Sequence, residues 1–381
     1  GAVSPRLTPR GSGSLESPLL RRDRDDAEHT QRLLAALGSS AASSFAAGNR
    51  RPLSPDPALW SCFSFWMQQV APNWEVVGRS RKVEALWKAQ GVCPLARGAV
   101  WPLAIGNPLH LNRELFQILG KRARLARAPL GQGPAFGREG TARLVQTDLE
   151  RTWAHLGLFH ADGPYAEQLQ DVLEAYCFFR PDVGYVQGMS FQAALLVLHC
   201  QDAFTAFTCL ANLLSRPFFL SFYRDKTGPL QLRMQIYERV LAHNLPELHK
   251  LLRQLDVAAG MYVTLWFVTL FAKQLPVPLA ARVWDQYLVD GEAFMYRAAV
   301  GIMAVLAPSL KEMDGDEVLC TLLGNIANRL PHHPKVLEAM LAVKLPRDAQ
   351  AMLDQLTAEE SVQEFKRPGR KPRTGSTGSS S

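Results

Sequence analysis

Residues 181–190 read Pro181-Asp182-Val183-Gly184-Tyr185-Val186-Gln187-Gly188-Met189-Ser190, and the apolar run 191–198 follows them. A proline, two glycines and an acid within ten residues indicate a turn, and the apolar run predicts a buried helix. Gln187 then lies on irregular backbone at a helix entrance, where glycine lets a ligand approach closely. An amide placed there can orient a water, because it both donates and accepts hydrogen bonds. The alternative is a capping turn whose glutamine only satisfies backbone groups.

A second stretch, 145–156, places an arginine on the free face of a predicted helix. Arg151 points away from the apolar face on a helical wheel, and Asp148 lies close enough to hold its guanidinium. An arginine held in this way suits electrostatic stabilisation of a partner's transition state. The alternative is a solvated surface arginine in an ion pair. The apolar residues recur at helical spacing, at Val145, Leu149, Trp153 and Leu156.

Three short motifs stand along the chain in a specific order. They are Arg97-Gly98-Ala99-Val100-Trp101, Val145-x-x-Asp148-x-x-Arg151 and Tyr185-Val186-Gln187. Together with Arg282-Val283-Trp284-Asp285, this ordered set resembles the TBC domain over core motifs at 87–313. That family comprises GTPase-activating proteins for Rab GTPases. The small departure is Val145, where the family usually has isoleucine, and it keeps the apolar, β-branched character.

The resemblance implies two catalytic side chains. Arg151 would neutralise charge that develops around the γ-phosphoryl group of the GTPase's nucleotide. Gln187 would orient the attacking water in place of the GTPase's own glutamine. Asp148 would orient Arg151, and the backbone that presents Gln187 would be set by Tyr185, Gly184 and Gly188.

The first motif is expected to serve architecture. Arg97 and Trp101 are four residues apart, so they share one face of the helix predicted at 97–105. We expect packing and hydrogen bonds between lobes from them, because a buried tryptophan contributes a large area and a buried arginine must be paired.

Helical patterns fill residues 58–345, and no run alternates as a strand does, so we predict an all-α fold. The resemblance implies a two-lobed TBC domain, with lead-in and trailing helices, and with the active groove between the lobes. Residues 257–272 carry no formal charge, and we interpret them as a central buried helix. A membrane span would need about twenty mostly apolar residues. A terminal helix is predicted at 346–365.

Both ends of the chain are poor in core-forming residues. Residues 1–57 are rich in Ser, Pro, Gly, Ala and Arg, and residues 366–381 are basic and then rich in Gly, Ser and Thr. This composition predicts disorder in both segments. The chain begins at Gly1 rather than at methionine, which we interpret as a fragment, and its start lacks the apolar core of a signal peptide.

The net charge of +7 belongs to these tails. Residues 1–60 carry eight Arg against six acids, and residues 366–381 carry five Lys and Arg and no acid, so the rest is neutral. A nucleic-acid-binding domain would carry its basic stripe on the folded part, so we expect no nucleic-acid partner. The basic tail instead weakly favours anionic membranes.

No metal or cofactor of the chain's own is expected. The six cysteines form no Cys-x-x-Cys pair, which favours reduced thiols in a cytosolic protein. The pairs His199-Cys200 and His332-His333 lack metal-ligand spacing. The glycine-rich segment 131–140 follows no strand, and no phosphate-binding loop motif is present. As the resemblance implies, GTP and Mg²⁺ would be carried by the Rab.

We therefore expect a catalytic activator of a Rab-family GTPase in its GTP form, and not a hydrolase with its own nucleotide site. The alternative is a module that only binds a Rab or serves as a scaffold in membrane traffic, because some family members lack one or both catalytic residues. The presence of both Arg151 and Gln187 favours catalysis. We expect a cytoplasmic location, peripheral at endomembranes through the partner or the basic tail.

Overall fold

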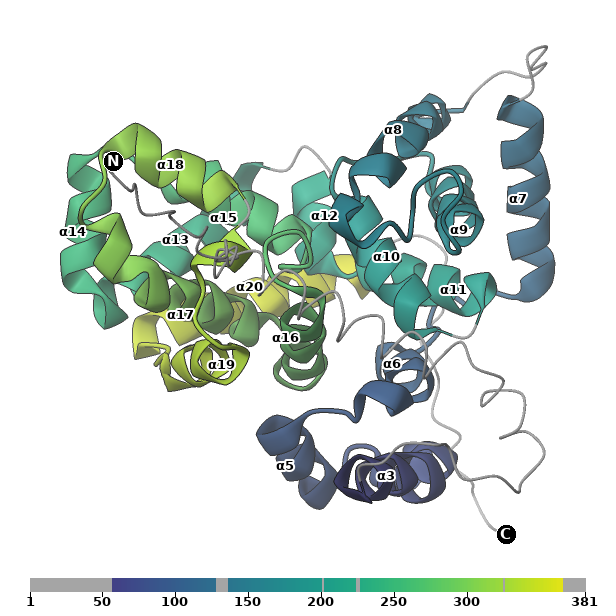
Figure 1. Ribbon diagram of the computed structural model, residues 1–381, viewed down its shortest axis with the longest axis horizontal. Coiled ribbons are helices and arrows are strands. Elements are labelled where there is room, and N and C mark those ends of the chain that lie inside the picture. The colour runs from purple at the N-terminus through teal and green to yellow at the C-terminus, as the bar shows by residue number, and fades with distance from the viewer. Residues whose placement is uncertain (1–56, 128–135, 201, 224–226, 325, 366–381) are drawn as a thin grey trace, which may run out of the picture.

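The computed structural model describes residues 57–127, 136–200, 202–223, 227–324 and 326–365 (Figure 1). Throughout these ranges the regular elements are helices and no strand occurs, so the predicted all-α fold is confirmed. The segments predicted to be disordered, 1–57 and 366–381, lie outside the described residues, apart from Pro57 at the start of the first described helix.

A lead-in bundle with its own small core precedes the first lobe. The core forms around Trp66 and Trp87, whose rings meet edge to face at 5.3 Å between centroids. This geometry suits the quadrupoles of two indoles. The bundle comprises α3 (Pro57–Ser64), η1 (Phe65–Val70), η2 (Ala71–Asn73), α4 (Trp74–Val77) and α5 (Arg81–Gln90).

The N-terminal lobe is built around α10 (Met189–His199), all of whose residues are buried. A helix that is apolar all round must be enclosed, and α9 and α11 enclose it here, while α7 forms the outer edge in Figure 1. The other helices of this lobe are η3 (Pro94–Ala96), α6 (Arg97–Ile105), α7 (Arg113–Arg127), η4 (Glu139–Ala142), α8 (Arg143–Arg151), η5 (Ala154–Leu156), α9 (Ala166–Phe179) and α11 (Ala203–Leu214).

The C-terminal lobe is built around α17 (Glu292–Leu310). This helix is long and apolar enough to cross a membrane by length and composition alone, but it lies in the protein core against α13, α16 and α19. The other helices are α12 (Pro217–Tyr223), α13 (Thr227–Asn244), α14 (Pro246–Gln254), α15 (Ala259–Val268), α16 (Val277–Asp290), α18 (Gly315–Leu323), η6 (Ile326–Arg329), α19 (His333–Ala342) and α20 (Arg347–Phe365).

A buried arginine joins three helices of this lobe. Arg233 on α13 is fully buried, and its guanidinium donates to Glu292 on α17 at 2.9 Å and to Glu360 on α20 at 2.9 Å. A buried guanidinium needs such carboxylates, because its charge cannot be left without a partner. The ion pairs therefore hold α20 against the lobe.

The helix predicted over 257–272 is shorter than expected. It begins at Ala259 and ends at Val268, and Leu270 and Phe271 take left-handed backbone angles, with φ of 48° and 60°. The carbonyl oxygens of the following turn have tertiary partners: that of Leu270 accepts from the Trp284 indole, and that of Ala272 from the Trp153 indole, each at 3.1 Å. Indole donors from outside the helix thus satisfy these carbonyl oxygens, and sequence periodicity does not reveal them.

Candidate functional site

Helix α8 presents Arg151 as its last residue. Val145 and Leu149 are buried on the opposite face, and the Arg151 side chain is 51% exposed, as the helical wheel predicts. The extension of this helix to Leu156 is wrong, because the chain turns at Thr152, and Trp153 takes a left-handed backbone with φ of 44°. The turn brings the Trp153 indole to its acceptor in the C-terminal lobe.

Asp148 is the polar centre of the site. Its carboxylate is buried; one oxygen forms the ion pair with Arg151, and the other accepts the Tyr185 hydroxyl at 2.5 Å. Burial, and then the bond to Asp148, raise the pKa of Tyr185 well above its usual range, so the hydroxyl remains a donor. Both carboxylate oxygens are thus used, and Arg151 is tethered at one side while its other side faces solvent.

The turn before α10 presents Gln187. Gly184 and Gly188 have φ of 67° and 101°, in the left-handed region that favours glycine. A Cβ at Gly184 would lie 2.5 Å from the Thr141 hydroxyl, which accepts the Tyr185 backbone N–H at 2.6 Å. The Gln187 side chain is exposed and has no hydrogen bond to a described residue, which does not support a capping role for it.

Two buried contacts join the arginine segment to the glutamine segment. The first is the Asp148–Tyr185 hydrogen bond, and the second is the contact between the Thr152 and Ser190 hydroxyls at 2.8 Å. Asp148 and Thr152 lie at the end of α8. Tyr185 lies in the turn before α10, and Ser190 lies at the start of α10. Arg151 and Gln187 are therefore carried by one rigid framework. The sequence did not indicate a role for Thr152 and Ser190, and the one sign of it is their position beside the two motifs.

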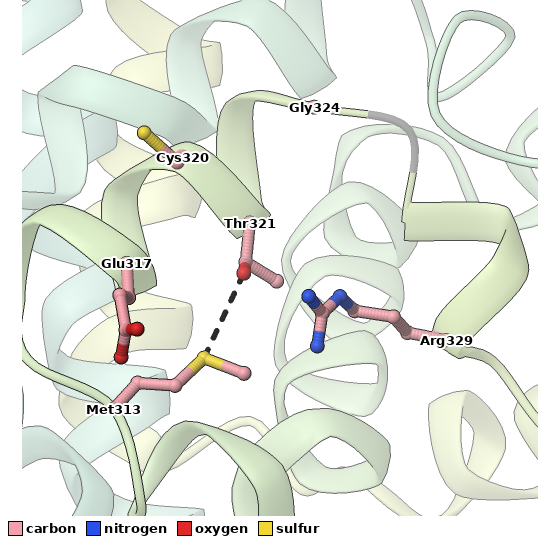
Figure 2. Close-up of a pocket in the computed structure, with 6 residues that line it drawn as sticks. All are labelled: Met313, Glu317, Cys320, Thr321, Gly324 and Arg329. Carbon is pink, nitrogen blue, oxygen red and sulfur yellow. Dashed lines mark hydrogen bonds between the residues drawn. The ribbon is translucent and has the colours of Figure 1, made fainter.

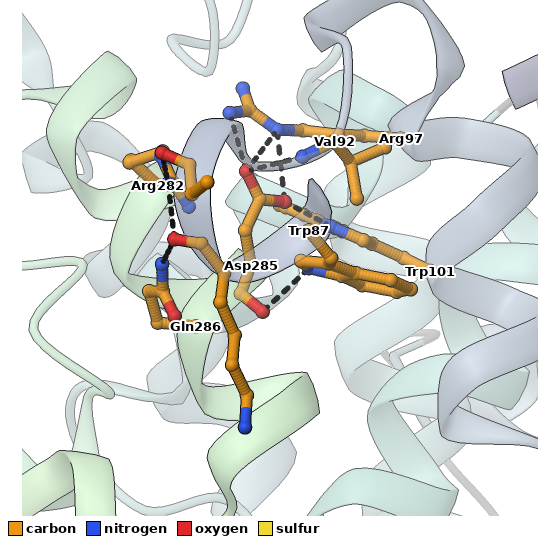
Figure 3. A network of polar contacts seen from close by, with 9 residues as sticks. Trp87, Val92, Arg97, Trp101, Arg282, Asp285 and Gln286 are labelled. Carbon is orange, nitrogen blue, oxygen red and sulfur yellow. Dashed lines mark hydrogen bonds and ion pairs between the residues drawn. The ribbon is translucent and has the colours of Figure 1, made fainter. Parts of the chain in front are cut away.

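The first motif lies in a separate network that joins the lobes (Figure 3). Asp285 on α16 is fully buried and accepts the Arg97 guanidinium at 2.9 Å, the Trp101 indole N–H at 2.9 Å and the Val92 backbone N–H at 3.3 Å. Its backbone carbonyl accepts the Trp87 indole N–H at 2.8 Å. One acid of α16 thus collects donors from the lead-in bundle and from the N-terminal lobe.

This network is distant from Gln187. Trp101 packs against His199, with ring centroids 4.7 Å apart. His199 is the last residue of α10, whereas Gln187 lies before its first residue. The helix between them is about 15 Å long at 1.5 Å per residue. Arg97 and Trp101 therefore cannot reach a group held by Gln187, and their geometry is that of an architectural contact.

A surface pocket of about 390 Å³ lies elsewhere, in the C-terminal lobe between α18 and η6 (Figure 2). The Thr321 hydroxyl donates to the Met313 sulfur at 3.6 Å, as the dashed line in Figure 2 marks. The pocket holds none of the residues predicted for the site. Its lining residues are Met313, Glu317, Cys320, Thr321, Gly324 and Arg329.

The model of the Rab-GTPase-TBC domain matches residues 95–311, which include every predicted site residue. The chain belongs to the Rab-GTPase-TBC domain family. Its similarity to solved structures agrees with this fold. The chain is similar to a Chlamydomonas flagellar RabGAP TBC domain, with a TM-score of 0.57 and 20% identity over 84% of this chain and 95% of that one. It is also similar to the Ypt/Rab-GAP domain of Gyp1p, with a TM-score of 0.52 and 18% identity over 74% and 92%.

Curated relatives share more of the sequence. TBC1 domain family member 14 of Rattus norvegicus is 39% identical over 260 residues, which cover 65% of this chain and 37% of that protein. Drainin of Dictyostelium discoideum is 29% identical over 312 residues, which cover 70% of this chain and 69% of that protein. The TBC family chain described here thus spans little more than a third of the first of these relatives.

Proposed function

We propose that this chain is a GTPase-activating protein that accelerates GTP hydrolysis by a Rab-family GTPase, with Arg151 and Gln187 acting in trans. The observation that carries the proposal is the shared framework of these two side chains. Asp148 and Tyr185 are buried and bonded to each other, while Arg151 and Gln187, which they support, are exposed. Rigid support beneath accessible groups is what a preorganised site needs.

Arg151 is suited to stabilise charge on the partner's nucleotide. Its guanidinium keeps part of its donor fork free, since Asp148 occupies one side only. A planar fork can bind phosphate oxygens bidentately. In phosphoryl transfer, negative charge spreads over the transferred group, and an arginine supplied in trans is worth roughly 10³–10⁵ in rate, or about 4–7 kcal/mol of barrier.

Gln187 is suited to hold the attacking water. Its amide offers both a donor and an acceptor, and neither is engaged by a described side chain. The two left-handed glycines on either side hold the backbone of the turn, so the amide is presented without a strained non-glycine residue beside it. Gln187 therefore replaces the water-orienting glutamine of the GTPase.

The deciding experiment is single-turnover GTP hydrolysis on a matched pair of Rabs. One Rab is unmodified, and the other has its catalytic glutamine replaced by leucine. The wild-type chain should accelerate both, because Gln187 supplies the missing amide. Gln187→Ala should lose activity on both Rabs, and Arg151→Ala or Arg151→Lys should do the same, since lysine lacks the planar fork.

Two surface substitutions serve as controls. Arg143→Ala removes another exposed arginine of α8, and Gln117→Ala removes an exposed glutamine of α7. Both should leave turnover unchanged, and every variant should keep the helical circular dichroism of the wild type. Acceleration that disappears whenever the Rab lacks its glutamine would overturn the role of Gln187. Binding to Rab·GTP without acceleration of any Rab would favour the scaffold function instead.

The proposed partner is the GTP form of the Rab, because Arg151 acts on the γ-phosphoryl group. We also propose that the protein works in the cytoplasm at endomembranes, where its partner is anchored. Nucleotide and Mg²⁺ enter with the Rab and not with this chain. Fractionation with and without GTP-loaded Rab on vesicles tests this, since recruitment should require the Rab.

A further inference from the structure

The turn between α15 and α16 contacts both segments of the candidate site. The Ala272 carbonyl accepts the Trp153 indole N–H at 3.1 Å, and Trp153 stands two residues after Arg151. On the other side, a Cβ added to Gly188 would lie 2.9 Å from the Thr269 methyl group. Residues 269–273 therefore sit against the arginine segment and the glutamine segment at once, across the junction of the lobes.

The backbone of this turn is held in an unusual conformation. Leu270 and Phe271 are consecutive non-glycine residues with positive φ, and both side chains are fully buried. A non-glycine residue with such a backbone is strained, and it persists only where the surroundings determine it. The surrounding packing therefore fixes the backbone of this turn. The first charged residue after Leu270 and Phe271 is Lys273.

Lys273 is a half-buried cation without an ion pair to a described residue. Partial burial, and then the neighbouring positive charge of Arg151, lower its pKa from the ordinary lysine range, while Asp148 opposes this. Asp148 is the nearby carboxylate, but Arg151 and Tyr185 already occupy its two oxygens. Lys273 and Arg151 are thus two cations near one carboxylate, that of Asp148, whose oxygens already have partners. This excess of positive charge favours the binding of an anion from outside the chain.

We propose that Lys273 is a second cationic contact for the bound GTPase complex, and that it binds an anionic oxygen beside the one that Arg151 addresses. This inference rests on the function proposed above. The anion belongs either to a phosphate of the nucleotide or to a carboxylate of the GTPase surface. An ammonium group binds either one as a point charge and without the geometry of a fork.

The test compares Lys273→Met, which keeps the length and removes the charge, with Lys273→Arg, which keeps the charge. We expect Lys273→Met to lower kcat/KM for Rab·GTP roughly tenfold. This factor corresponds to the loss of one of the weaker hydrogen bonds to a charged group. Lys273→Arg should stay within about threefold of the wild type, and the loss in Lys273→Met should shrink as salt screens the wild-type contact. The matched control is Lys250→Met, an exposed lysine on α14.

Affinity measurements separate the two sources of the anion. Rab loaded with GDP alone is compared with Rab loaded with GDP and aluminium fluoride. If the anion is the transferred phosphate, Lys273→Met weakens only the aluminium fluoride complex. If it is a surface carboxylate, Lys273→Met weakens both complexes equally. Either result supports the inference.

Two results overturn the inference. One is a Lys273→Met variant whose kcat/KM and affinities all stay within about twofold of the wild type, below the weakest charged contact. The other is an equal loss of activity in both variants with a lower melting temperature, which would make Lys273 a structural residue. If the wild type accelerates no Rab, the proposed function fails on its own, and the affinity measurements alone then decide the role of Lys273.

Discussion

Asp285→Ala should destabilise the whole protein more than any change at the candidate site. It removes the acceptor of three buried donors: Arg97, Trp101 and the Val92 backbone N–H. The Arg97 side chain is only 5% exposed, so its charge would be left buried without a partner. That situation costs about 3–5 kcal/mol, and each neutral N–H left unpaired costs about 1–3 kcal/mol.

We expect a total loss of about 5 kcal/mol, tempered by water that enters the space left by the side chain. Such a loss is comparable with the entire stability of many domains. Equilibrium urea unfolding, followed by tryptophan fluorescence, measures it directly. The surface pair Arg239–Asp348, with an oxygen–nitrogen distance of 2.7 Å, offers the control: Asp348→Ala should leave the midpoint nearly unchanged.

A double-mutant cycle then isolates the ion pair. Arg97→Met removes the charge that Asp285→Ala leaves without a partner, so the double variant should be about 2–3 kcal/mol more stable than the sum of the single losses predicts. Additive losses, or a loss below about 2 kcal/mol for Asp285→Ala, would show that this network does not hold the lobes together.

Three further predictions follow from the site and its surroundings. Tyr185→Phe removes the 2.5 Å bond to Asp148, so unfolding free energy should fall by about 1–3 kcal/mol and single-turnover GTP hydrolysis on Rab should slow; unchanged values for both would exclude the framework role. Gly184→Ala places a methyl group 2.5 Å from the Thr141 hydroxyl at positive φ, and its urea midpoint should drop well below that of the wild type. Burial lowers the pKa of His199 to about 3, so His199 stays neutral in the folded state, whereas the unfolded chain protonates it below about pH 6.5. The free energy of unfolding should therefore fall by about 2 kcal/mol from pH 7 to pH 5. The His199→Gln variant should lose this pH dependence.

Local pattern was sufficient for features that depend on neighbouring residues. The exposure of Arg151 follows from the spacing of Val145 and Leu149, which are buried on the far face of α8. The buried helix after Gly188 follows from an uninterrupted apolar run. In both places the residues that decide the structure lie within a few turns of one another along the chain.

Long-range partners account for what the sequence did not reveal. In the turn after α15 the Ala272 carbonyl accepts the Trp153 indole N–H, and Trp153 is 119 residues away. Asp285 belongs to the motif Arg282-Val283-Trp284-Asp285, but its donors Arg97 and Trp101 are 188 and 184 residues away. No window of sequence contains both ends of such a bond, so periodicity cannot predict it.

The Asp285 network also bears on where this protein can be cut. The family match spans residues 95–311, but Trp87 and Val92, which donate to Asp285, lie before it, and Glu360, which pairs with the buried Arg233, lies after it. A fragment trimmed to residues 95–311 would keep Arg151 and Gln187 and lose partners of two buried charged residues, Asp285 and Arg233. The segment that the family model matches is therefore smaller than the segment that folds, and limited proteolysis should leave a resistant core that still includes Trp87 and Glu360.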